Sequence, residues 1–196
     1  MTDQPAIGAE AVRTSETHPI QVDFLPADIV PFPGRIGMTI APGKRLIGMA
    51  AVWERDLEQD LQRLRQHYHT DVLVSLVQEI ELETLNTPNL LSQIASHHMR
   101  SIWFPVPDFG TPASMSGLIQ LVEQILELAH AGQTVVIHCR AGLGRTGLVT
   151  SACLVALGFS ATHAFMRVRE ARPGCVETVA QEAYVQQFER EWRNRS

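Results

Sequence analysis

A ten-residue stretch, HCRAGLGRTG at 138–147, brings together one cysteine, two arginines and three glycines. Cysteine becomes a nucleophile when it loses its proton, and arginine presents a planar fork that binds two oxygens of a phosphate. Glycine allows successive backbone N–H groups to turn toward one bound anion. The stretch therefore predicts a site in which a sulfur nucleophile acts on a bound oxyanion.

The sequence on either side of this stretch predicts where it lies in the fold. TVVIH at 134–138 is a short run of apolar, mostly branched residues, typical of a buried strand, and helical sequence resumes near Thr146. A loop between them lies at a helix N-terminus, where unpaired N–H groups and the helix dipole favour an anion. The same field, with Arg145 close by, favours the thiolate form of Cys139. We therefore expect one loop both to bind the anion and to activate the sulfur.

Strands and helices alternate along most of the chain. Runs of apolar residues predict strands at 18–26, 34–43, 71–77, 100–106 and 134–138. Helical spacing predicts helices that begin near Glu54 and Pro88, and others at 114–131, 146–157, 160–171 and 178–192. This alternation favours a single α/β domain with a central, mostly parallel sheet flanked by helices. We place the domain at 18–196, after a flexible N-terminal leader at 1–17 that lacks periodicity.

Composition limits the classes of function. The 196-residue chain has a formal net charge of −5 at pH 7, which gives no general attraction to nucleic acid or to an anionic membrane surface. No long apolar run predicts membrane insertion, and the first residues lack the pattern of a signal peptide. Three cysteines without short spacing argue against a disulfide framework. We expect a cytoplasmic protein and leave its oligomeric state open.

The pattern C-x5-R-[ST]-G after a buried strand resembles the signature of the cysteine-dependent protein tyrosine and dual-specificity phosphatases. Further segments extend the resemblance over about residues 18–192, and their order is similar to that in the kinase-associated phosphatase (cyclin-dependent kinase inhibitor 3) family. These segments are HPIQV, IGMTIAPGK, PVPDFGTP and RPGCVETVAQEAYV. The resemblance implies the fold of these phosphatases and the hydrolysis of a phosphate monoester through a phosphocysteine intermediate.

The resemblance also implies roles for single residues. Cys139 is the nucleophile, and the phosphate is held by the loop residues Arg140, Ala141, Gly142, Leu143, Gly144 and Arg145. Asp108 in PVPDFGTP precedes the cysteine at the family's spacing and is the general acid, with an ordinary turn aspartate as the alternative. This chemistry needs no metal and no other cofactor.

Three further residues complete the predicted site. The resemblance assigns the Thr146 hydroxyl to stabilising the departing thiolate and Gln181 to positioning the hydrolytic water. Thr146 could instead cap the following helix, and Gln181 could be a buried structural amide. His138 is expected to support the loop from beneath through hydrogen bonds, and Arg172 is a candidate brace for the site.

The substrate stays open within this reaction class. A phosphorylated protein is expected as the partner, with a kinase among the candidates. Phosphotyrosine is the expected target, and phosphoserine and phosphothreonine are left open. Phosphoinositides and RNA 5′ ends are processed by the same chemistry, and the depth of the pocket, which separates these substrates, does not follow from sequence. Lipid phosphatases of the tensin type have lysines where this chain has Arg140 and Leu143, so only the first position carries a cation.

Two other classes of protein use a similar loop. A rhodanese-type sulfurtransferase also holds a cysteine in an anion-binding loop, but it leaves Asp108 and the Arg-Thr-Gly ending unexplained. A non-catalytic phosphoprotein-binding module would lack the nucleophile, whereas Cys139, Asp108 and Arg145 are all present. Of the other cysteines, Cys153 is expected to be a buried apolar filler. Cys175 is a candidate resolving thiol for an oxidised Cys139, and redox regulation through either is left open.

Overall fold

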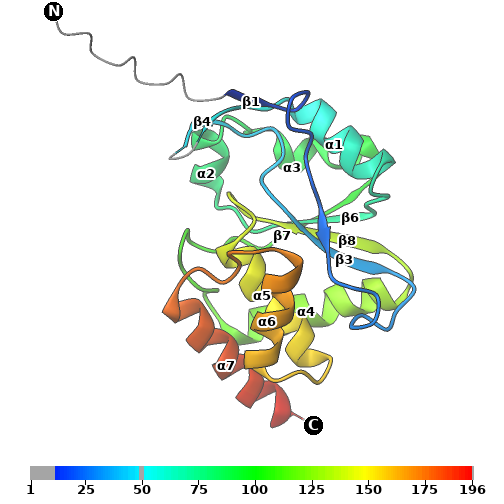
Figure 1. Cartoon of the computed structure of the whole chain (residues 1–196), viewed down its shortest axis with the longest axis vertical. Helices are drawn as coiled ribbons and strands as arrows, with labels where there is room; N and C mark the ends of the chain where they lie inside the picture. The colour runs from blue at the N-terminus through cyan, green and yellow to red at the C-terminus, as the bar shows by residue number, and fades with distance from the viewer. Residues whose placement is uncertain (1–11, 49–50, 196) are drawn as a thin grey trace, which may run out of the picture.

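A five-stranded sheet forms the centre of the computed structural model, which describes residues 12–48 and 51–195 (Figure 1). Its strand order is β2-β3-β8-β6-β7. The strands are β2 (Asp23–Phe24), β3 (Arg35–Thr39), β8 (Thr134–His138), β6 (Val72–Ser75) and β7 (Arg100–Trp103). Only β2 runs antiparallel to its neighbour. The predicted single α/β domain with a mostly parallel sheet is confirmed.

Helices cover both faces of this sheet (Figure 1). One face packs against α4 (Met115–His130), α5 (Gly144–Ala156), α6 (Ala161–Ala171) and α7 (Val179–Arg193). The other carries α1 (Leu57–Gln66), α2 (Glu79–Thr84), α3 (Leu90–Gln93) and the 3₁₀ helix η1 (Ala95–His97). Successive residues of β6 serve the two cores in turn, since Val72 and Val74 face the first and Leu73 the second. Burial on both faces explains the unbroken apolar runs of the central strands.

Helix α5 is the most enclosed helix of the first layer. Nearly all of its residues from Gly144 to Val155 are buried. It packs against α4, α6 and α7 as well as against strands β3 and β8. The loop before it is therefore attached to two buried elements, strand β8 on one side and helix α5 on the other.

A second sheet of three strands lies beside the first, and the sequence did not predict it. Its order is β1 (Val12–Thr14), β5 (Val52–Glu54) and β4 (Arg45–Ile47). Residues 12–17 were expected in a flexible leader, but β1 pairs with β5 and Ser15 is buried, so that part of the prediction is wrong. The rest of the predicted leader, residues 1–11, lies outside the described residues. Strands this short carry little local signal because their partners are remote in sequence.

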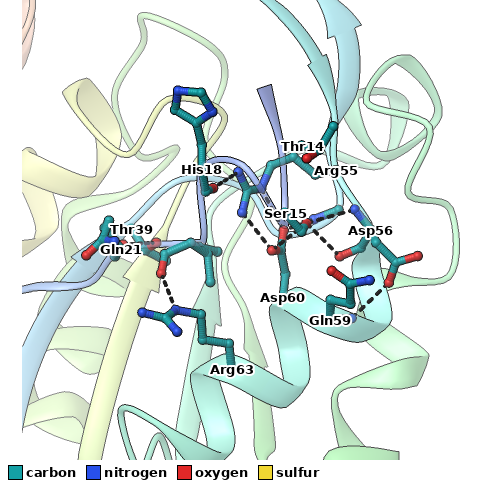
Figure 2. A network of polar contacts seen from close by, with 12 residues as sticks. Thr14, Ser15, His18, Gln21, Thr39, Arg55, Asp56, Gln59, Asp60 and Arg63 are labelled. Carbon is teal, nitrogen blue, oxygen red and sulfur yellow. Dashed lines mark hydrogen bonds and ion pairs between the residues drawn. The ribbon is translucent and has the colours of Figure 1, made fainter. Parts of the chain in front are cut away.

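A buried ion pair attaches this N-terminal segment to α1. The Arg55 guanidinium donates to both carboxylate oxygens of Asp60, at 2.7 and 2.8 Å, and to the His18 carbonyl at 2.8 Å. Figure 2 shows this arginine between His18 and α1, with Ser15 donating to the same aspartate at 2.9 Å. The side chains of Arg55 and Asp60 are each only 1% exposed. Because a buried charge without its partner is costly, the pair holds residues 15–18 in one place.

Several predicted boundaries change for identifiable reasons. The first helix begins at Leu57, not near Glu54, because residues 52–54 form β5 and Asp56 caps α1 by accepting from the Gln59 N–H at 2.9 Å. The strand expected at 18–26 is reduced to Asp23–Phe24. The helix expected from Pro88 divides into α3 and η1 and ends at His98 in the left-handed region. Within the described part of the chain, the helices are all too short or too polar to cross a membrane.

Candidate active site

The predicted loop joins β8 to α5 and lies against the end of β3. Cys139 follows the last residue of β8 and is 2% exposed. Gly142 has a φ of +69°, and a Cβ at this position would lie 2.2 Å from the Thr39 carbonyl oxygen. Glycine is therefore required here for both its backbone conformation and its small volume.

Two cationic side chains hold the carbonyl groups of this loop. Lys44 Nζ donates to the Arg140 carbonyl at 3.3 Å. The Arg172 guanidinium donates to the carbonyls of Ala141 at 3.1 Å and Gly142 at 2.7 Å. In a trans peptide the N–H points away from the carbonyl, so the next N–H groups in the chain turn to the opposite side. Lys44 and Arg172 thus fix the carbonyl groups of three successive loop residues, and the N–H groups that follow them are directed away from these two cations.

Arg145 is the centre of the polar contacts beside the loop. Its guanidinium donates to both carboxylate oxygens of Glu81, at 2.6 and 2.9 Å, and to the Val106 carbonyl at 2.9 Å. It also donates to Asp108 Oδ1 at 2.8 Å. Burial alone would lower the pKa of Arg145, but its bonds to Glu81 and the nearby charges of Cys139 and Asp108 raise that pKa overall. The guanidinium therefore stays charged although its side chain is 1% exposed.

Glu81 was not predicted from the sequence. It lies on α2, a helix that was also missed, and its carboxylate accepts from the Gln78 N–H at 2.9 Å in a capping box. Burial opposes ionisation, but the bond from Arg145 and the bond from the Gln78 backbone lower the pKa of Glu81 below its ordinary value. One carboxylate therefore both begins α2 and orients Arg145. The only sequence signal was a glutamine followed three residues later by a glutamate.

Asp108 lies within reach of the loop, as predicted. It follows β7 in a segment with irregular structure, and its side chain is 33% exposed. Besides its bond to Arg145, its second oxygen lies 3.7 Å from the Arg140 guanidinium. The two cations of the predicted phosphate loop therefore both interact with this one carboxylate.

Gln181 is fully buried and uses both ends of its amide. Its oxygen accepts from the backbone N–H groups of Glu177 at 2.9 Å and Thr178 at 3.3 Å. Its nitrogen donates to the Gly110 carbonyl at 3.2 Å, which attaches the Asp108 segment to α7. These contacts are those of a structural amide, which was the alternative to its water-positioning role. That role stays a prediction.

His138 lies beneath the loop, where the sequence placed it. One ring nitrogen lies 2.8 Å from Ser75 Oγ on the neighbouring strand β6, and the other lies 3.3 Å from the Cys139 carbonyl. Burial lowers the pKa of His138 to about 4. The ring is therefore neutral near neutral pH and acts as a hydrogen-bonding support.

Thr146 does not cap α5. The helix begins at Gly144, so Thr146 lies inside its first turn, and the capping alternative is wrong. Its hydroxyl is buried, with no hydrogen-bond partner among the described residues. A buried hydroxyl without a partner is costly. The role of this hydroxyl in stabilising the departing thiolate stays a prediction.

Glu177 is a second carboxylate that the sequence analysis missed. Its Oε2 accepts from the Gly144 N–H at 2.8 Å, at the start of α5. One N–H of the predicted loop is therefore occupied by the protein's own carboxylate.

In residues 12–48 and 51–195, we find no group of three or more His, Cys, Asp or Glu arranged to hold a metal ion.

The two remaining cysteines are buried, Cys153 as expected for an apolar filler. Burial raises the pKa of each thiol to about 12. Cys175 lies close to the loop, with its sulfur 3.9 Å from the Gly142 carbonyl oxygen and 3.9 Å from the Met38 sulfur. Its role as a resolving thiol stays a prediction.

Comparison with known proteins identifies the relatives of this chain. The family model of cyclin-dependent kinase inhibitor 3 (CDKN3) matches residues 6–164. Rat cyclin-dependent kinase inhibitor 3 is 28% identical over 182 residues, which cover 91% of this chain and 83% of the relative.

Two solved structures share the fold. Kinase associated phosphatase, with its catalytic-site cysteine replaced by serine, has a TM-score of 0.80 at 22% identity, covering 89% of this chain and 96% of the other. Tk-PTP in its active form has a TM-score of 0.68 at 29% identity, covering 86% and 96%.

The bracing of the loop carbonyls predicts an effect of Arg172 on anion binding. Arg172→Met removes the donors to the Ala141 and Gly142 carbonyls, so we expect the inhibition constants of phosphate and vanadate to rise about tenfold or more. The matched control is Asp23→Asn, which removes only the acidic partner of Arg172 and should leave both constants nearly unchanged. Unaltered anion affinity in a folded Arg172→Met protein would mean that the loop keeps its shape without this brace.

The buried, neutral His138 predicts a dependence of stability on pH. Its folded pKa of about 4 lies below the ordinary value of 6.5, so its contribution is complete above pH 6.5 and is lost as the pH falls toward 4. We expect about 3 kcal/mol of unfolding free energy to be lost through this group over that interval. Urea unfolding at pH 7 and pH 4.5 measures this loss. Between these two pH values, the unfolding free energy of His138→Gln should fall by less than that of the wild-type protein. An equal fall in the two proteins would contradict a neutral His138.

Proposed function

Since the chain belongs to the cyclin-dependent kinase inhibitor 3 (CDKN3) family, we propose that it hydrolyses phosphate monoesters of a phosphorylated protein through a phosphocysteine on Cys139. It is a phosphoric monoester hydrolase of the cysteine-dependent tyrosine and dual-specificity phosphatase class. The observation that carries the mechanism is the convergence of Cys139, Arg145 and Asp108 at the carboxyl end of β8. The structure of kinase associated phosphatase, in which a catalytic-site cysteine is replaced by serine, supports the same assignment.

The first step transfers the phosphoryl group to sulfur. The phosphate of the substrate binds the N–H groups of the loop and the Arg145 guanidinium, which releases Asp108 from its bond to that arginine. The Cys139 thiolate attacks phosphorus, and the bond between phosphorus and the substrate oxygen breaks. Asp108, which takes up a proton from solvent once it is released from Arg145, donates that proton to the leaving oxygen.

The second step restores the enzyme. Water attacks the phosphorus of phosphocysteine and gives one proton to the Asp108 carboxylate, and the sulfur–phosphorus bond breaks. The departing thiolate then accepts a hydrogen bond from Thr146, whose hydroxyl is buried and has no partner among the described residues. Inorganic phosphate leaves, and Asp108 is again protonated for the next cycle.

The names of the relatives support a kinase as the phosphorylated partner, since they refer to inhibition of, or association with, a kinase. We propose phosphotyrosine as the target, with phosphoserine and phosphothreonine as further targets. A cytoplasmic location belongs to the same proposal, supported by three free cysteines. The catalytic domain then begins by Val12, because β1 is part of the fold.

The first test of this function replaces the nucleophile. Cys139→Ser should lose hydrolysis of p-nitrophenyl phosphate, because the hydroxyl is not ionised at neutral pH. The wild-type protein should remain active in EDTA and be inhibited by vanadate, and Cys153→Ala is the matched cysteine control that should stay active. Full activity of Cys139→Ser, or transfer of sulfur from thiosulfate to cyanide by the wild-type protein, would overturn the assignment.

The second test concerns the general acid. Asp108→Ala should lower kcat about 10²-fold or more for alkyl phosphates, whose leaving groups need a proton, and less than about tenfold for p-nitrophenyl phosphate. Because Asp108 also occupies Arg145, its removal should lower the KM for both kinds of substrate. Steady-state kinetics across a series of leaving groups measures both effects. An equal loss of kcat for every leaving group would assign the proton to another residue.

A further inference from the structure

A small hollow, here called the N-terminal pocket, lies beside the phosphate loop and is not used by the mechanism. Its volume is about 210 Å³, and its lining includes Arg13, His18, Gln21, Ile40, Trp53 and Arg172. We propose that it binds a second anionic group of the phosphoprotein substrate, an acidic side chain or another phosphate near the phosphorylated residue. This inference rests on the proposed function and names a determinant of its specificity.

The small sheet builds the floor of this pocket. In the parallel pairing of β1 with β5, Arg13 stands opposite Trp53. The Arg13 guanidinium carbon lies 5.3 Å from the centre of the Trp53 ring, and Lys44 Nζ lies 3.8 Å from it. The indole therefore holds two cations in fixed positions, which lowers the cost of ordering them when an anion binds.

Charge separates the two faces of the small sheet. Among the described residues, no carboxylate lines the N-terminal pocket, whereas the neighbouring hollow is lined by Glu16, Glu54 and Asp56. Alternation along β5 places Trp53 in the first hollow and Glu54 in the second. The N-terminal pocket is thus the cationic face, and it suits an anion.

Arg13 is the cation that remains available in this pocket. Arg55 is neutralised by Asp60, and Arg172 by Asp23. Among residues 12–48 and 51–195, no carboxylate makes an ion pair with Arg13. Lys44 lies close by, and burial together with the charge of Arg55 lowers its pKa to about 8. An anion in the pocket would relieve this repulsion between cations.

The pocket and the phosphate loop share a wall. Arg172 lines the pocket and donates to the loop carbonyls of Ala141 and Gly142. Ile40, also in the lining, precedes Ala41, whose N–H donates to the Arg140 carbonyl at 3.4 Å. A peptide whose phosphate lies in the loop therefore has a neighbouring residue within reach of the pocket, and the volume fits one carboxylate or phosphate group.

A buried ion pair holds one part of the pocket wall in place. Arg55, whose side chain is 1% exposed, fixes the His18 backbone by donating a hydrogen bond to the His18 carbonyl (Figure 2).

The phosphoprotein is favoured over a phosphoinositide headgroup because the family is that of a kinase inhibitor. A headgroup with several phosphates is the competing outcome in the test.

The test compares phosphotyrosine peptides of one sequence that differ at a single position within three residues of the phosphotyrosine. Glutamate, glutamine and phosphoserine are placed there in turn, and kcat/KM for the phosphotyrosine is measured. At the favoured position we expect the wild-type protein to prefer glutamate or phosphoserine over glutamine about fivefold or more. Arg13→Ala should reduce this ratio toward one, and Arg13→Glu should reverse it.

Three controls separate this inference from the proposed function. Hydrolysis of p-nitrophenyl phosphate should be unchanged in Arg13→Ala, because this substrate does not reach the pocket. Arg190→Ala, which removes an exposed arginine on α7, should keep the wild-type preference. If no peptide is hydrolysed, the proposed function fails. The same peptides are then compared by their dissociation constants from Cys139→Ser. Loss of the preference when Arg13→Ala is added to this variant would still support the pocket.

Two outcomes would contradict the proposed pocket, and a third would narrow it. Active enzyme with equal kcat/KM for the glutamate and glutamine peptides at every position would overturn the pocket while leaving the phosphatase assignment intact. A preference for phosphoserine alone would narrow the pocket to a second phosphate. If Arg13→Ala slows the hydrolysis of inositol 1,3,4,5-tetrakisphosphate but not that of any peptide, the pocket belongs to a headgroup and the inference is wrong.

Discussion

The buried guanidinium of Arg145 is the constraint on which the arrangement of this site depends. A charge so enclosed is tolerated only when hydrogen bonds and an opposite charge surround it. Glu81 supplies both through a two-point contact, and the Val106 carbonyl takes a further donor. Because these partners come from α2 and from the segment after β7, the position of Arg145 fixes both relative to α5.

Asp108 accepts from the same guanidinium through Nη2, which also donates to Glu81. Asp108 is therefore held beside the loop by the guanidinium that the proposed mechanism assigns to the phosphate. In the proposed mechanism, phosphate and Asp108 compete for this arginine, so binding of the substrate releases Asp108. Gln181 adds a second constraint on the same segment by donating to the Gly110 carbonyl.

Side chains from remote parts of the chain brace the predicted phosphate loop. Lys44 and Arg172 hold three successive carbonyls on the outer side, and His138 supports the loop from below. Each brace comes from a different part of the chain. The backbone of the loop is thus fixed by contacts from remote residues, while Glu177 accepts from the Gly144 N–H and Asp108 accepts from Arg145.

Local sequence was enough to predict the chemistry of the loop and most of the sheet. Cys139, Arg145 and the glycines lie within a few residues of one another, so one short motif contains them all. An unbroken apolar run predicts β8, and helical spacing predicts α5. Asp108 was found because its distance along the chain matches a known family. The three long helices from α5 to α7 began and ended within a few residues of their predicted bounds for the same reason.

Only the tertiary structure revealed the groups that act at long range. Glu81 lies 64 positions from Arg145 and Lys44 lies 96 positions from Arg140, and neither residue has a local pattern that points to its partner. The strands of the small sheet are too short to show alternation, so Arg13 was assigned to a leader although it stands beside Trp53. Sequence by itself predicted the reacting groups, because Cys139 and Arg145 lie in one short motif and Asp108 lies at the spacing of a known family. The fold decided what orients them and what surrounds them, because buried charges select partners by distance in space and not along the chain.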